Sequence, residues 1–201
     1  MAYIDKCGVE YSDDRKTLVH CPDSYKGDYT IPEGVTTIGK AAFADCFSYE
    51  ILHENNGITL PITGGLMAVH LPTTIEVIED GAFSNCWKLS SLLLPESLRI
   101  IGTHAFYGCE SIKEISIPEG VNIIGARAFE NCNSLQRLSL PNSIQSIGSA
   151  AIADNMYDDK PWWPHVISAL KEIIVPKGQK QRFIGMFGDY STDLSTLIIE
   201  K

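Results

Sequence analysis

Long apolar runs, positive charge and catalytic motifs are all scarce in this chain of 201 residues. No run of about 18 consecutive apolar residues occurs, so no segment is predicted to cross a bilayer as a helix. The first residues have neither the basic nor the apolar region of a signal peptide, and we expect none within this chain. Lys and Arg number 16 against 25 Asp and Glu, for a net charge of −9. That acidity argues against nucleic acid and anionic membranes as partners.

Motifs for catalysis and cofactor binding are missing as well. The sequence contains no Gly-x-Ser-x-Gly, no Walker loop and no Gly-x-Gly-x-x-Gly. Its five histidines show no close ligand spacing, and its six cysteines include no Cys-x-x-Cys pair. We therefore predict no enzyme activity, no cofactor and no metal site. With 44% hydrophobic and 20% charged residues, the chain has a globular composition and should form a folded core.

A repeat of 23 residues organises most of the chain. A proline preceded by Leu or Ile begins the same pattern five times, and the last three steps between these five prolines are each 23 residues. Isoleucine follows each proline by six positions and alanine by ten, while phenylalanine at eleven and cysteine at fourteen are missing only from the last unit. The prolines are Pro32, Pro72, Pro95, Pro118 and Pro141; the phenylalanines are Phe43, Phe83, Phe106 and Phe129; the cysteines are Cys46, Cys86, Cys109 and Cys132.

The second half of each unit reads L-x-x-L-x-L, as in 89–94, 112–117 and 135–140, and alternates inward and outward at the period of a strand. One unit cannot bury its aliphatic face alone, so neighbouring units must stack into a solenoid with a shared core. Stacking would place the repeated cysteines in one buried column, where we expect them to satisfy turn backbone groups. Glycine stands seven positions after each of these prolines except one, where Glu79 replaces it. We expect this glycine to adopt a backbone conformation, or to approach another part of the chain so closely, that a Cβ would be obstructed.

The ends of the chain depart from the period and predict caps. Residues 1–30 hold two short apolar stretches around a charged turn, which predicts a hairpin over the first coil. If Tyr11 faces Thr17 in that hairpin, Cys7 faces Cys21, as either a disulfide or two free thiols.

Two insertions interrupt the repeats predicted for 31–155. Seventeen extra residues follow Cys46, and Asn56-Gly57 among them predicts a β-hairpin leaving the wall near 48–65, with a plain loop as the alternative. Residues 156–201 are interpreted as a second insertion and a C-terminal cap. There the strand pattern recurs at 170–175 and 194–199, and 179–187 is predicted to be a short helix or turn.

Adjacent tryptophans mark the second insertion. Trp162 and Trp163 lie between two prolines, and such a pair favours either a lid over the last coil or an anchor for a ligand. We favour the lid, because the exposed core of a terminal coil must be covered. The whole chain, 1–201, is interpreted as one domain.

The repeat unit, I/L-P-x-x-V/I-x-x-I-G-x-x-A-F-x-x-C followed by the leucine-rich strand, resembles the BspA-like leucine-rich repeat of bacterial surface proteins. The resemblance covers most of the chain. It implies a leucine-rich repeat solenoid that is mostly β with short turn or helical segments. It also implies a secreted or cell-surface protein that adheres to other proteins; a cytoplasmic location is the alternative.

The outward positions of the leucine-rich strands form two columns where a partner would bind. One column is His70, Leu93, Ser116, Ser139 and Ile174. The other is Ala68, Ser91, Glu114, Arg137 and Glu172. We expect a non-catalytic protein-interaction or adhesion module that uses this face and the protruding insertions. The alternatives are a carbohydrate-binding surface protein that uses Trp162 and Trp163, and an intracellular structural subunit.

Overall fold

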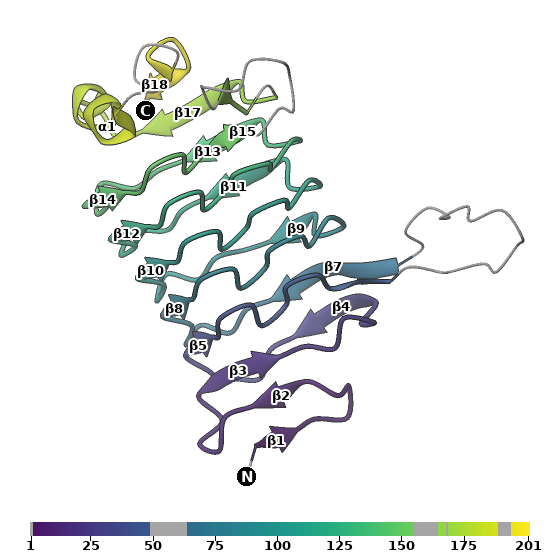
Figure 1. Cartoon of the computed structure of the whole chain (residues 1–201). Coiled ribbons are helices and arrows are strands. Elements are labelled where there is room, and N and C mark those ends of the chain that lie inside the picture. The colour runs from purple at the N-terminus through teal and green to yellow at the C-terminus, as the bar shows by residue number, and fades with distance from the viewer. Residues whose placement is uncertain (1, 49–63, 155–164, 168, 189–193) are drawn as a thin grey trace, which may run out of the picture.

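The computed structural model is a solenoid with the two chain termini at opposite ends (Figure 1). The structure describes residues 2–48, 64–154, 165–167, 169–188 and 194–201. Short strands stack coil upon coil along two sides of the molecule, which we call the long wall and the outer wall. The predicted leucine-rich repeat solenoid, mostly β, is confirmed.

The long wall is an eight-stranded sheet in the order β1-β2-β3-β5-β8-β10-β12-β14. From β3 onward its neighbours are parallel and in register, so that Ile38, Ile78, Ile101 and Ile124 follow one another across the sheet. Its strands are β1 (Tyr3–Ile4), β2 (Glu10–Tyr11), β3 (Thr17–His20), β5 (Thr37–Ile38), β8 (Val77–Ile78), β10 (Ile100–Ile101), β12 (Ile123–Ile124) and β14 (Ser146–Ile147).

The outer wall carries the leucine-rich strands. Here β4 pairs with β7 and β7 with β9, while β11, β13, β17 and β18 form a second parallel group. These strands are β4 (Gly27–Thr30), β7 (Gly64–His70), β9 (Ser91–Leu92), β11 (Glu114–Ser116), β13 (Arg137–Ser139), β17 (Glu172–Val175) and β18 (Ile198–Glu200).

The core between the walls is a set of residue columns. Phe43, Phe83, Phe106 and Phe129 stack face to face, with ring centroids 5.0, 5.3 and 5.3 Å apart and planes within 7° of parallel. All four are buried. Because the repeated part of every unit has the same spacing, equivalent side chains lie directly above one another, and Phe83 and Phe106 each lie between two other rings.

The recurrent glycines are explained by close approach between coils. A Cβ on Gly125 would lie 2.4 Å from the backbone N of Thr103, and one on Gly148 would lie 2.2 Å from that of Ala126. Neither glycine has a positive φ, so space and not conformation excludes a side chain. Glu79, at the exceptional position, accepts a hydrogen bond from the backbone N–H of Lys40 at 2.8 Å.

Four of the five units place two residues in the left-handed region, and the last unit places one, a feature that the repeat pattern did not predict. The position nine residues after the proline has φ between 53° and 65°, and the position thirteen residues after it has φ between 56° and 68°. The first set is Ala41, Gly81, His104, Arg127 and Ala150. The second set is Asp45, Asn85, Gly108 and Asn131. Every member of the second set is Asp, Asn or Gly, the residue types that favour this conformation, so the sequence held a consistent signal only there.

Replacing Ala41 with glycine is therefore expected to raise the free energy of unfolding by about 1 kcal/mol, because glycine removes the left-handed penalty of a residue at φ 53°. The reverse change, Gly81→Ala, should cost a similar amount. A Cβ there meets nothing closer than Ser84 Cβ at 3.9 Å, so conformation alone is tested. Urea denaturation of both variants measures the effect. A stabilising Gly81→Ala would contradict the assignment.

The N-terminal cap is a hairpin, as predicted, with a different register. β2 pairs antiparallel with β3, and β1, which was not predicted, adds a strand to β2. Tyr11 lies opposite Leu18 and Glu10 opposite His20, with an irregularity between the two pairs. The predicted pairing of Tyr11 with Thr17 is wrong by one residue, because the turn, with Arg15 at φ 56°, fixes the hairpin register at Tyr11 opposite Leu18. The irregularity then shifts the register again beyond Tyr11.

The shifted register also separates the two cysteines of the cap. Cys7 is exposed, Cys21 is buried, and both are free thiols. Cys7 follows Asp5, whose carboxylate accepts the backbone N–H groups of Cys7 and Val9 at 2.8 and 2.9 Å. Of the two arrangements considered for this pair, the structure therefore has the free thiols.

The base of the first insertion is a pair of antiparallel strands. β6 (Phe47–Ser48) lies beside the start of β7, with Phe47 opposite Gly65 and Ser48 opposite Gly64. Figure 1 shows β7 extending beyond the edge of the outer wall. The base of the predicted hairpin is thus confirmed, whereas Asn56-Gly57 lies outside the described residues.

The last coil is covered by the helix α1 (Lys180–Phe187), so of the two alternatives expected at 179–187, a short helix or a turn, the structure has the helix. Phe183 and Phe187 are buried in the core cluster, and the Arg182 guanidinium donates to the carbonyl of Ile144 in the coil below. Aromatic cover for this end therefore comes at least in part from α1. Trp162 and Trp163 lie outside the described residues, and their role as a lid stays a prediction. A further pair of strands, β15 (Ala153–Asp154) and β16 (His165–Val166), is antiparallel.

The final strand differs from its predicted phase by one residue. Ile198 pairs with Ile173 and is buried, whereas Ile199, expected to face inward, is 38% exposed. A shift of one residue moves each side chain to the other face of a strand. The pattern 194–199 therefore identified the strand and misplaced its register.

Candidate interaction surface

The two predicted columns form in the structure and run across the outer wall. Glu114, Arg137 and Glu172 lie opposite one another on β11, β13 and β17, and Ala68 lies opposite Ser91 on β7 and β9. The second column aligns Ser116, Ser139 and Ile174 across the same three strands. Leu93 directly follows Leu92, the partner of Val69, and so lies beside His70.

A third outward column was not among the predicted site residues. It occupies the second position of L-x-x-L-x-L, a position that could have been read from the pattern in the same way. Backbone hydrogen bonds link its members from coil to coil, from Ser90 to Met67, from Gln136 to Lys113 and from Lys171 to Gln136. Met67 is 54% exposed. We call the three columns together the outer face.

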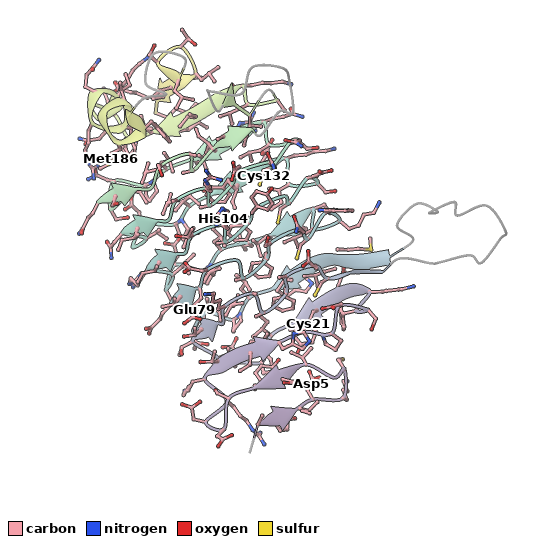
Figure 2. The ribbon with its side chains drawn as sticks, viewed as in Figure 1. Asp5, Cys21, Glu79, His104, Cys132 and Met186 are labelled. Atoms are coloured by element: carbon pink, nitrogen blue, oxygen red, sulfur yellow. The ribbon has the colours of Figure 1, made fainter. Side chains whose placement is uncertain are left out.

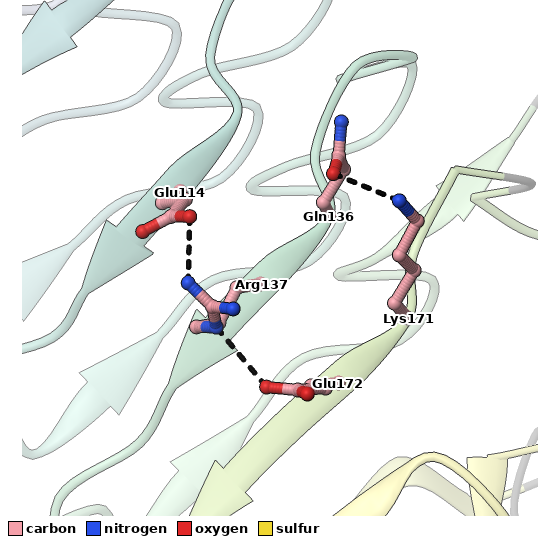
Figure 3. Close-up of polar contacts among 5 residues, drawn as sticks. All are labelled: Glu114, Gln136, Arg137, Lys171 and Glu172. Carbon is pink, nitrogen blue, oxygen red and sulfur yellow. Dashed lines mark hydrogen bonds and ion pairs between the residues drawn. The ribbon is translucent and has the colours of Figure 1, made fainter.

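One half of the outer face is charged and internally paired (Figure 3). Arg137 Nη1 donates to Glu114 Oε1 at 2.6 Å, and its Nε donates to Glu172 Oε2 at 3.1 Å. The hydrogen bond to Glu172 and the nearby charge of Glu114 raise the pKa of Arg137. Beside them, Lys171 donates to Gln136 at 3.0 Å. The charged and polar groups of this half are therefore already hydrogen-bonded to one another across three coils, and they form a polar border on this side of the outer face.

The other half, on β7 and β9, carries no Asp, Glu, Lys or Arg. Leu93 is 83% exposed, which makes it the most exposed large apolar side chain among the described residues. We call this half, which adjoins the β6–β7 projection, the uncharged half. Its residues are Met67, Ala68, His70, Ser90, Ser91 and Leu93.

Two hollows in the described residues lie away from the outer face. One, of about 470 Å³, is lined at the N-terminal cap by Tyr3, Tyr25 and Tyr29 among others. Another, of about 320 Å³, lies on the long wall around Val77 and Ile100. The outer face is a broad surface of mixed apolar, polar and charged side chains, and neither of these hollows lies on it. Such a surface suits a macromolecular partner better than a small molecule.

The repeated cysteines form the predicted structural column. Cys86, Cys109 and Cys132 are buried, and each thiol donates to the carbonyl of the phenylalanine one coil earlier, to Phe43 at 3.0 Å, Phe83 at 3.1 Å and Phe106 at 3.2 Å. In Figure 2, Cys132 lies on the same side of the solenoid as Cys21. Within the residues that the structure describes, no three His, Cys, Asp or Glu side chains are grouped so as to hold a metal ion.

Thiol labelling of the native protein should therefore modify exposed Cys7 and spare Cys86, Cys109 and Cys132 until the chain unfolds. Burial raises the pKa of all three thiols, to about 12 for Cys132, so few thiolates form even when reagent reaches them. The same raised pKa values make the free energy of unfolding depend on pH. Their stabilising contribution is complete below the thiol pKa of the unfolded chain, which is about 8.5. That stabilisation is lost as the pH rises toward 12. Rapid native labelling of the three would contradict the column.

The repeat and the stacked coils define a leucine-rich repeat solenoid, and comparison with known proteins agrees with both. The model of the BspA type leucine rich repeat region matches residues 24–60 and 63–157 in six copies. The chain belongs to this family. The match begins before residue 31, where the first repeat was predicted to start.

Solved structures of bacterial leucine-rich repeat proteins are similar to this chain. A leucine rich cell surface protein from Faecalibacterium prausnitzii is 26% identical, with a TM-score of 0.70 over 92% of this chain and 42% of its own. A T. pallidum leucine rich repeat protein is 27% identical, with a TM-score of 0.61 over 82% of this chain and 66% of its own. The pneumococcal vaccine antigen PcpA, 23% identical with a TM-score of 0.64 over 87% of this chain and 36% of its own, shares the fold.

This chain thus spans less than half the length of the Faecalibacterium prausnitzii protein. No curated protein matches it. In the part of the chain that the structure describes, the single helix, α1, is too short to cross a membrane.

Proposed function

We propose that this protein is a non-catalytic protein-interaction module of a bacterial cell surface, which binds a protein partner through the uncharged half of the outer face. The observation that carries the proposal is Leu93, a large apolar side chain that is 83% exposed on a wall of small neighbours. Burial of such a side chain in a partner stabilises a complex by removing apolar area from water.

The arrangement around Leu93 supports an interface. Binding energy concentrates in a few central apolar or aromatic groups, surrounded by residues that exclude water. Here Leu93 and Met67 would be the central groups, and the paired charges of Glu114, Arg137 and Glu172 would border them on one side. Charge depletion at the centre and polar groups at the border are the usual composition of a protein interface.

The cell-surface location and an adhesive role rest on similarity. The Faecalibacterium prausnitzii protein is described as a leucine rich cell surface protein, and it matches nearly the whole of this chain. The pneumococcal protein is described as a vaccine antigen and supports the fold alone. We infer the same location for this protein, with adhesion to host proteins as its role.

The test compares Leu93→Asp with a matched control on the opposite wall. Ile123 is 42% exposed on β12, so Ile123→Asp introduces the same charge at an exposed aliphatic position of the long wall. Both variants and the wild type are titrated by biolayer interferometry against purified host extracellular proteins and glycans. We expect one protein ligand, weakened about 30-fold by Leu93→Asp, as for a loss of about 2 kcal/mol. Ile123→Asp should bind normally.

Two results would count against the proposal. Equal loss in both variants would place the interface elsewhere or indicate unfolding, which circular dichroism detects. Binding to glycans alone, abolished by a double change of Trp162 and Trp163 to alanine, would favour the carbohydrate-binding alternative.

A further inference from the structure

The cysteine column ends differently at the N-terminal cap. In the complete coils, the thiol of each column cysteine lies 3.0 to 3.2 Å from a carbonyl oxygen. Cys46, the first member of the column, lies 3.8 Å from both the Cys21 and the Pro22 carbonyls. Its thiol is therefore the least firmly bound to backbone in the column.

The neighbour of Cys46 is a second thiol. The Cys46 Sγ lies 3.8 Å from the Cys21 carbonyl oxygen, so the two residues are adjacent. The neighbouring Cys46 thiol and burial raise the pKa of Cys21. Cys21 and Cys46 are 0% and 1% exposed. Both are free thiols, so two reduced cysteines lie side by side in the core.

The repeat explains why the pair occurs only here. In the complete coils, the phenylalanine N–H donates to the alanine carbonyl of the next coil, as from Phe43 to Ala82 and from Phe83 to Ala105. The N–H of Cys21 donates in the same way to Ala42 at 2.7 Å. Cys21 thus occupies the phenylalanine position of the coil that the cap replaces. A thiol stands where the other coils have a ring, and this brings it beside the column cysteine of the next coil.

We propose that Cys21 and Cys46 are an oxidisable pair, and that a low-molecular-weight disulfide such as oxidised glutathione converts them to a disulfide that links the N-terminal cap to the first repeat. One cysteine thiolate attacks the external disulfide, forms a mixed disulfide and releases one thiolate. The second cysteine thiolate attacks the protein sulfur of that mixed disulfide and releases the other thiolate. The protein loses two electrons and two protons, and the external disulfide is reduced to two thiols.

Access to the pair requires local opening of the cap. Cys21 follows β3, whereas Cys46 belongs to the first repeat, so separation of the cap from that repeat exposes both sulfurs together. Openings at the end of a solenoid need less energy than global unfolding, because a terminal unit has a neighbour on one side only. Cys86, Cys109 and Cys132 stay covered by coils on both sides. The cap is therefore the place where oxidant meets a thiol pair.

The disulfide would hold the cap closed. It closes a covalent loop between two residues that the unfolded cap would otherwise leave far apart, which disfavours the open state. The cap lies over the end of the phenylalanine stack, with Tyr29 between the cap and Phe43 at a centroid distance of 6.0 Å from that ring. Oxidation would thus protect the exposed end of the core.

The experiment uses the full chain, incubated with oxidised glutathione and then alkylated after unfolding without reductant. The chain has six cysteines, so reduced protein should take six alkyl groups. Oxidised protein should take three, because Cys21 and Cys46 are joined and the exposed Cys7 carries one glutathione as a mixed disulfide. Mass spectrometry of the unreduced digest should map the bond to Cys21 and Cys46. The thermal midpoint of the oxidised protein should rise by about 5 °C or more.

Variants locate the effect. Cys21→Ala and Cys46→Ala should each abolish the bond and the gain in midpoint, whereas Cys109→Ala should keep both. Mapping in the wild type does not depend on whether a variant folds. Five or more alkyl groups after incubation, or a bond that joins any other pair, would overturn the proposal.

Discussion

Truncation of Phe106 to alanine should lower the free energy of unfolding by about 3 to 5 kcal/mol, as for other buried aromatic residues. The ring is fully buried between those of Phe83 and Phe129, each 5.3 Å away, so its loss leaves a cavity under two neighbouring coils. Denaturant melts followed by circular dichroism measure the change. The same truncation at Phe129 should have a comparable cost.

A matched surface truncation shows whether the loss is specific to the core. Lys113 is exposed in the third outward column, and its replacement with alanine should change stability by less than about 0.5 kcal/mol. A cost below about 1 kcal/mol for both phenylalanines would mean that the rings do not form the core of the repeats.

A single methyl group on Gly125 should be nearly as damaging, at about 3 kcal/mol. The added Cβ would lie 2.4 Å from the Thr103 backbone N and 2.5 Å from the Gly102 carbonyl carbon, so the neighbouring coil must move and its strand pairing must stretch. Overpacking of a tight interior commonly costs about 1 to 3 kcal/mol, and here the obstacle is backbone.

Gly185→Ala is the control for that change. Gly185 lies within α1, where a Cβ meets nothing within 4 Å, and alanine favours a helix by about 0.5 to 1 kcal/mol. Thermal and urea melts should therefore show opposite signs for the two glycine substitutions. Unchanged stability in Gly125→Ala would show that the coils do not approach as closely as the structure indicates.

The sequence alone was sufficient to predict the neighbours of a residue wherever that residue recurs at the repeat spacing. A constant unit length carries each residue to the same place in the next coil, so Phe106 must meet Phe83 and Phe129, and Cys109 must lie in line with Cys86. The same argument placed the outward columns, including Glu114 and Arg137, before any contact was known. The alignment of the two outward columns was predictable for this reason, because recurrence shows which side chains face outward together.

Where the period ends, the tertiary structure decided the outcome. Three features have no repeated counterpart: the turn that sets Tyr11 opposite Leu18, the phase that buries Ile198, and the two phenylalanines of α1. Local pattern could identify these segments as strand or helix. Their register depends on how a unique segment packs against the last coil it meets.

Within the outer face, the sequence predicted which residues are neighbours, and the structure showed which contacts their side chains make. The spacing of the strands set Arg137 between Glu114 and Glu172, but only the observed contacts show that its charge is satisfied on both sides. Recurrence also could not show that Cys21 takes a phenylalanine position, because the cap has its own sequence. The repeat in the sequence determined which residues stack. At the two non-repeating ends, only tertiary packing determined which side chains meet. Each end has a single neighbouring coil, and no second copy of the terminal segment exists to define the register of that segment.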